Sequence, residues 1–281
     1  MPGDLNHLTD QDLLDQLVRS GLTLLTISQQ RLARAGRVPD DPRWGAPLPL
    51  RFESQVAVLF LGALDACDAT IGLLRTRASQ QAFHTLRFQI ESMAIIRWMS
   101  EPKAAADRQH RAYRVACGQI RRFGRFMMRD AGRDRDALNS VRAIRDWAAR
   151  LREIAKEDGI ADLKQEPPLP ELFKTMRDVA GYPNFSMYSE FGSHPGTAGN
   201  TFFALSGDSR NISYDLGGSV IERGFLVGAS IFYLWKTCEA VSPAMSWQEW
   251  LQADAQAAYR SALPLLEESV RRRRASAGSG S

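Results

Sequence analysis

The strongest constraint on the fold is a pattern of apolar residues that recur every three or four positions over long stretches of the chain. One face of an α-helix has this period, whereas a half-buried strand alternates every second residue. The pattern is interrupted by Gly and Pro, which end helices. It predicts helices at residues 9–35, 50–75, 79–99, 104–131, 134–156, 171–179, 219–240 and 246–273.

These helices predict an all-α fold, a bundle of about seven to nine helices. Residues 181–218 form one irregular segment with seven glycines, in which two short β-prone runs (201–206 and 211–216) predict a small β-hairpin. The expected organisation is an N-terminal helical arm (1–36), a Pro-rich connection (37–49), the bundle domain (50–273) and a disordered tail (274–281).

Two helix starts carry capping signals. Thr9 is followed three residues later by Asp12, which predicts an N-cap for the first helix. Ser246 with Glu249 predicts a capping box at the start of the last helix.

The composition is that of a globular protein with a packed core, at 44% apolar and 24% charged residues. The net charge is +4, but 31 of the 36 basic residues are Arg, a bias typical of a GC-rich bacterial genome. We therefore give the arginine count little weight as evidence for nucleic acid.

The N-terminus lacks the pattern of a signal peptide, and the longest apolar stretch, 224–235, is too short for a membrane span. We expect a cytoplasmic protein without membrane association. Its three cysteines lie far apart and predict no disulfide.

One predicted core helix carries three polar residues on a single face. His84, Arg87 and Glu91 are spaced i, i+3 and i+7, so they project from one side over two turns. Arg87 can bind a carboxylate or phosphate through two parallel hydrogen bonds, and Glu91 can act as a general base. The alternative is a structural pair in which Arg87 and Glu91 neutralise each other inside the core.

A second polar group lies in the irregular segment. Tyr188, Ser193 and His194 stand before Pro195 in a loop, where functional residues concentrate. The imidazole of His194 can transfer a proton near neutral pH, or it can be a structural clip to Glu91. We predict a pocket with His194 and Glu91 as catalytic groups, in which Arg87, Tyr188, Ser193, His84 and Trp98 bind the ligand.

Other common site chemistries have no supporting motif. His84, Glu91 and His194 do not have the spacing of zinc or di-iron ligands, so we expect no metal. There is no G-x-S-x-G sequence, and the Gly-rich stretch 192–199 lacks the Lys of a phosphate-binding loop. We expect no cofactor.

The helix at 104–131 carries a stripe of arginines that could follow a phosphate backbone: Arg114, Arg121, Arg125 and Arg129. The alternative is a solvated helix face.

The segments AFHTLRFQIESMAIIRWMSEP (82–102) and YSEFGSHPG (188–196) resemble an uncharacterised bacterial helical family with an L-x-R-x-x-x-E helix and an S-x-H-P turn. This chain lacks one intervening residue of each pattern, because Leu86 directly precedes Arg87 and Ser193 directly precedes His194. The resemblance covers roughly residues 50–240 and implies the helical fold and the grouping of Arg87, Glu91 and His194.

That family is distantly similar to HEPN domains, some of which are ribonucleases in toxin and phage-defence systems. Their nuclease motif is an Arg four to six residues before a His. His194 has no such Arg, whereas Arg77 is separated from His84 by six residues. The resemblance thus implies an alternative RNA-directed function that uses Arg77 and the arginine stripe.

Three functions remain open from the sequence. The first is a small-molecule pocket for an anionic ligand, with or without acid/base catalysis. The second is an RNA-directed protein, for which a homodimer interface would matter. The third is a structural or partner-binding helical module.

Overall fold

The computed structural model describes residues 5–36, 38–130, 135–179, 185–186, 203–205, 212–214 and 219–278. It confirms the all-α helical bundle predicted from the sequence. The long helices are α1 (Asp10–Ala35), α2 (Phe52–Arg75), α3 (Ser79–Ser100), α4 (Ala105–Asp130), α5 (Arg135–Glu157), α9 (Val220–Met245) and α11 (Gln256–Gly278).

Short elements connect the long helices. They are the 3₁₀ helices η1 (Leu5–His7) and η2 (Phe173–Val179), the helical turns α6 (Leu169–Leu172) and α10 (Gln248–Trp250), and the π-helical turn η3 (Leu251–Ala255). Within the irregular segment, β1 (Phe203–Leu205) and β2 (Ile212–Tyr214) form an antiparallel pair, with Phe203 opposite Tyr214.

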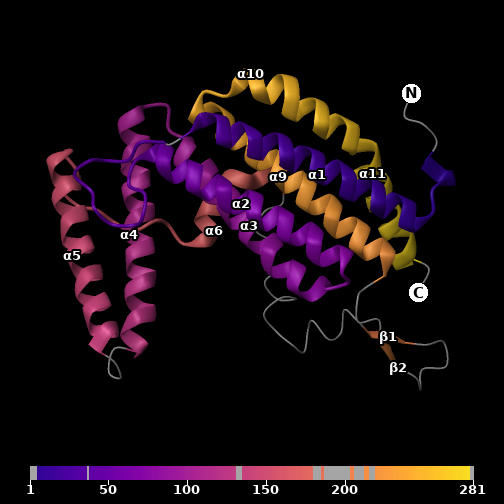
Figure 1. Cartoon of the computed structure of the whole chain (residues 1–281), viewed down its shortest axis with the longest axis horizontal. Coiled ribbons are helices and arrows are strands. Elements are labelled where there is room, and N and C mark those ends of the chain that lie inside the picture. The colour runs from indigo at the N-terminus through magenta and orange to yellow at the C-terminus, as the bar shows by residue number, and fades with distance from the viewer. Residues whose placement is uncertain are drawn as a thin grey trace.

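The main core surrounds α9, which packs against α1, α2, α3 and α11 (Figure 1). Leu17, Phe60, Ile90 and Leu234 come from four different helices, and none of them is exposed to solvent. Burial of such side chains stabilises a fold by about 1.5–3 kcal/mol each. The bundle is therefore held together chiefly by apolar packing around one central helix.

Helix α1 belongs to this core and does not form the separate arm expected from the sequence. A Cβ atom on Gly21 would lie 2.9 Å from Cδ1 of Ile71 and 3.1 Å from Cγ1 of Ile231, so the glycine lets α1 approach α2 and α9 closely. The predicted capping box at its start is confirmed, because Thr9 and Asp12 exchange hydrogen bonds at the helix N-terminus. The long connection after α1 is compatible with either an arm or a core helix, and apolar packing against α2 and α9 places α1 in the core.

At the junction between the last two long helices, the sequence prediction is wrong. Ser246 adopts a left-handed backbone conformation (φ 57°) and ends α9, with its N–H donating to the carbonyl of Ser242. It does not cap the following helix, which Trp247 precedes without a side-chain cap. Helix α11 continues to Gly278, so residues 274–278 of the expected tail are helical.

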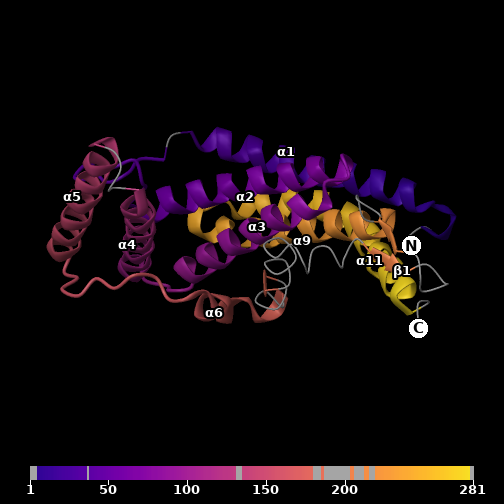
Figure 2. The ribbon, with the colours of Figure 1, turned by 90° about the horizontal axis from the view of Figure 1, so that it is seen from below.

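Helices α4 and α5 form a hairpin that stands at one end of the bundle (Figures 1 and 2). The hairpin has a second, smaller core in which Tyr113, Leu151 and Ile154 pack with Trp44 from the Pro-rich connection and with Leu50, which directly follows it. The connection therefore packs between the bundle and the hairpin.

One described helix, α2, is long and apolar enough to cross a membrane by length and composition. In this structure it packs against α3 and α9, and Phe60, Leu64 and Cys67 are fully buried there. Core helices of soluble proteins have the same composition, so α2 is compatible with a soluble protein.

Candidate functional site

The three polar residues of α3 lie along one side of the helix, in the order given by their spacing. His84 is exposed, whereas Arg87 and Glu91 are partly buried. Arg87 and Glu91 are one helical turn apart, which allows their charges to interact. The structure therefore brings these two residues together at the border between the core and the solvent.

Arg87 packs on an aromatic ring from a distant part of the chain. Its guanidinium carbon lies 5.0 Å from the ring centroid of Phe185, which in turn lies 5.1 Å from the ring of Phe173 in η2. A guanidinium that stacks on a ring uses its face and leaves the N–H groups at its edge available to hydrogen-bond acceptors. Phe185 stands three residues before Tyr188 in the sequence.

Glu91 is in an environment that disfavours its ionised form. Burial raises the pKa of the Glu91 carboxyl above its ordinary value. The nearby guanidinium groups of Arg87 and Arg122 act in the opposite direction, and the carboxylate of Glu166 adds to the increase. A carboxyl with a raised pKa can exchange a proton closer to neutral pH, as a general acid or base requires.

A second carboxylate belongs to this cluster, and the sequence alone did not predict it. Glu166 follows the end of α5 in a segment without helix or strand, yet its side chain is only 8% exposed. It forms an ion pair with Arg122 of α4, and its backbone N–H donates to the carbonyl of Arg114 at 3.1 Å. Its Oε2 atom has no hydrogen-bond partner among the described residues.

Gly118 explains how the Glu166 carboxylate reaches α4. A Cβ atom at position 118 would overlap this carboxylate, so only glycine leaves room for it. The one sequence signal for this contact was therefore an isolated glycine in a long helical pattern.

Trp98 lies at the other end of α3 from His84 and has a packing role. The indole is 6% exposed, and the guanidinium groups of Arg111 and Arg114 lie 4.8 and 5.2 Å from its ring centroid. Arg114 also donates from Nε to the backbone carbonyl of Gln165 at 3.1 Å. Trp98 and Arg114 thus help to anchor α4 and the 165–166 segment.

The remaining predicted residues are dispersed. Arg121 and Arg125 are exposed on α4 and face α5, whereas Arg77 lies in the turn after α2. The start of α2 contacts α4 through a hydrogen bond between the Phe52 N–H and Gln109. Because α2 is 24 residues long, Arg77 lies about 36 Å from that contact. The structure does not bring Arg77 to the arginine stripe.

Several predicted residues lie outside the described part of the chain. Tyr188, Ser193 and His194 are among them, as is the side chain of Arg129. Within the described ranges, no group of three or more His, Cys, Asp and Glu side chains is arranged to hold a metal ion.

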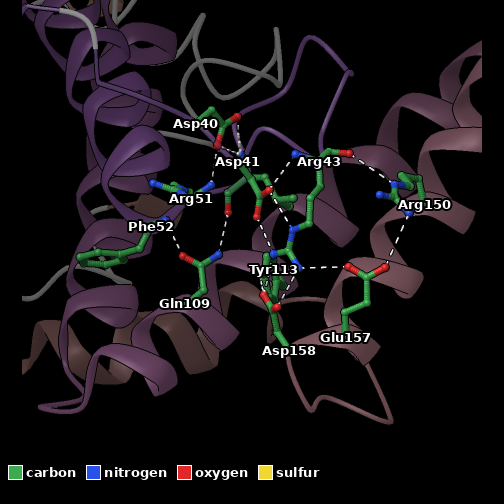
Figure 3. A network of polar contacts seen from close by, with 11 residues as sticks. Asp40, Asp41, Arg43, Arg51, Phe52, Gln109, Tyr113, Arg150, Glu157 and Asp158 are labelled. Carbon is green, nitrogen blue, oxygen red and sulfur yellow. Dashed lines mark hydrogen bonds and ion pairs between the residues drawn. The ribbon is translucent and has the colours of Figure 1, made fainter.

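A polar network fixes the hairpin that carries Arg122 and Gly118 (Figure 3). Arg43 donates to Asp41 at 2.7 Å, to Glu157 at 3.1 Å and to Asp158 at 2.9 Å. The hydroxyl of the buried Tyr113 donates to Asp158 as well. Arg43 therefore joins the Pro-rich connection to the end of α5, as charge-assisted hydrogen bonds with several partners do.

The same network shifts the acid–base properties of its members. Hydrogen bonds from Arg43 lower the pKa values of the Asp41 and Asp158 carboxyls, while burial acts in the opposite direction. Burial and the bond to Asp158 raise the pKa of the Tyr113 hydroxyl. Both carboxylates are stabilised in their ionised forms, which is typical of a structural clamp.

Comparisons of this chain with protein-family models, with curated proteins and with solved structures find no match.

Proposed function

We propose that this protein binds a small anionic molecule at the polar face of α3, where Arg87 binds the anion and Glu91 exchanges a proton with it. The observation that carries the proposal is the placement of these two side chains one turn apart, both partly accessible, at the edge of an apolar core. The raised pKa of the Glu91 carboxyl supports this placement as a site, because carboxyls with perturbed pKa values are concentrated at functional sites.

The surroundings of Arg87 support a role in anion recognition. The Arg87 guanidinium lies over the ring of Phe185, a contact that restricts its movement. A carboxylate or phosphate can then accept two parallel hydrogen bonds from the guanidinium edge. His194, Tyr188 and Ser193 complete the proposed pocket, with His194 as the second proton-transfer group and His84 at its rim. The contact between Arg87 and Phe185 supports this grouping, because Phe185 precedes Tyr188 by three residues.

The RNA-directed alternative has less support. It needs Arg77, His84 and the arginine stripe to act on one nucleic acid, and Arg77 lies at the end of α2 opposite to the contact with α4. Arg114 of the stripe is engaged with Trp98 and Gln165. We therefore favour the small-molecule function.

The proposal predicts that a panel of carboxylates and phosphate monoesters contains at least one compound that raises the melting temperature of the wild-type protein. At a saturating concentration we expect an increase of about 3 °C or more, because a ligand that binds only the folded state stabilises it. Arg87→Ala and His194→Ala should abolish this shift. Thermal unfolding measures it, and mass spectrometry of the denatured protein detects any anion that co-purifies.

Two further variants make the test specific. Arg75→Ala removes an exposed arginine at the end of α2 and should leave the ligand-induced shift unchanged. Glu91→Gln should retain binding but lose the part of its pH dependence that the Glu91 carboxyl contributes, because that titrating group is absent. An Arg87→Ala variant with every shift of the wild type intact would show that this face is structural.

A further inference from the structure

A cavity of about 760 Å³ lies between α4, α5 and the segment at Leu163–Gln165, and none of its lining residues belongs to α3. Its apolar wall comes from both helices and includes Ile120, Ile144 and Leu151. The volume is within the range of about 300–1,000 Å³ that is usual for small-molecule pockets.

Every charged side chain that lines this cavity is a cation: Arg121, Arg125, Arg145, Arg152 and Lys164. Among the described residues, Arg125, Arg145 and Arg152 have no ion pair. Lys164 lies 3.7 Å from the exposed Asp162, and Arg121 donates to the side-chain oxygen of Gln165. Like charges around one cavity repel each other, and a bound anion would relieve this repulsion.

The lining of the cavity selects the kind of anion. Its cations are exposed, whereas Ile120, Ile144 and Leu151 are only 3%, 7% and 1% exposed, so the apolar residues form a recessed slot beneath a charged rim. None of the lining side chains is aromatic, so there is no platform on which a nucleic-acid base could stack.

From the apolar slot and its cationic rim we infer that the cavity between α4 and α5 binds a free single-chain anionic amphiphile. The apolar chain lies along Ile120, Ile144 and Leu151. The carboxylate or phosphate head group is held by the rim, chiefly by Arg125 and Arg145, which come from the two opposite helices.

Laurate below its micellar concentration is the probe for this inference, measured by isothermal titration calorimetry with the full-length protein. We expect saturable binding to the wild type. The double variant Arg125→Gln/Arg145→Gln should bind laurate about tenfold more weakly or worse, because it lacks two charge-assisted contacts. Arg142→Gln, an exposed arginine of α5 that does not line the cavity, is the matched control and should bind like the wild type.

A second variant tests the slot instead of the rim. Ala148 lines the cavity, and Ala148→Leu fills part of it without placing a charge in the core. We expect laurate binding to be lost while the far-ultraviolet circular dichroism spectrum stays helical. Dodecyl maltoside, with the same chain and no charge, should bind the wild type at least about tenfold more weakly than laurate.

Three results would overturn the inference. The first is a wild-type protein that binds no laurate below its micellar concentration. The second is unchanged laurate affinity in both the double variant and Ala148→Leu. The third is a wild-type protein that binds vesicles of anionic phospholipid or single-stranded RNA but not monomeric laurate. None of these results depends on Arg87, so a failure of this inference does not count against the proposed function of α3.

Discussion

Replacing Gln89 with Leu is expected to lower the free energy of unfolding by about 3 kcal/mol. Gln89 is fully buried on α3 and joins it to α9. Its Nε2 donates to the carbonyl of Ser230 at 2.9 Å, and the Ser230 hydroxyl donates to Oε1 of Gln89 at 3.0 Å. A leucine leaves that hydroxyl in an apolar core with only the weak acceptor Sγ of Cys67, at 3.3 Å.

The double variant Gln89→Leu/Ser230→Ala is the control for this mechanism. When both polar partners are replaced by apolar groups, no hydroxyl that has lost its oxygen acceptor remains, so we expect about half of the lost stability to return. Urea unfolding monitored by circular dichroism measures both variants. If the loss of stability in the double variant equals the sum of the losses in Gln89→Leu and Ser230→Ala, the pair contributes nothing as a unit.

Replacing Arg43 with Gln is expected to lower the free energy of unfolding at pH 7 by about 2 kcal/mol. This value is below that of a fully buried ion pair because the Arg43 side chain is 34% exposed and its charge is partly screened. The variant leaves the 6% exposed carboxylate of Asp41 without its guanidinium and removes the link to Asp158. Local opening of the 38–51 connection should follow.

The pH dependence of the free energy of unfolding identifies the cause of the stability lost in Arg43→Gln. Asp41 and Asp158 have pKa values below the ordinary value of 3.8 in the folded protein. Their contribution is therefore present above pH 4 and is lost as the pH falls through the folded-state values. The difference between wild type and Arg43→Gln should shrink below pH 4, as measured by urea unfolding at a series of pH values. A difference that is constant from pH 7 to pH 3 would exclude these carboxylates as the cause.

Much of the fold follows from local sequence signals. The helical period locates the long helices, and Thr9 with Asp12 marks the start of α1 correctly. These features depend on residues within one or two turns of each other. Ser246 shows the limit of such signals, because the same residue type can cap the start of one helix or end the preceding helix, and here it ends α9.

The candidate site was predictable only in part. Arg87 and Glu91 share one helix, so their spacing alone brings them together. Glu166 and Arg122 are 44 residues apart, and nothing local indicates that the Glu166 carboxylate would be buried against Gly118. Likewise, the cations of the α4–α5 cavity come from two helices and a loop, whose register against one another is set by tertiary packing.

We propose that α3 keeps the Glu91 carboxylate for binding chemistry and not for stability. The most direct test is the free energy of unfolding of wild type and Glu91→Gln between pH 4 and pH 8. Because the folded-state pKa of Glu91 is above its ordinary value of 4.5, wild-type stability should fall as the pH rises from about 4.5 through the folded-state pKa. The Gln variant should lack this loss and be about 1 kcal/mol more stable than wild type at pH 7. A Gln variant that is less stable than wild type at pH 7 would contradict the account and make Glu91 a structural residue.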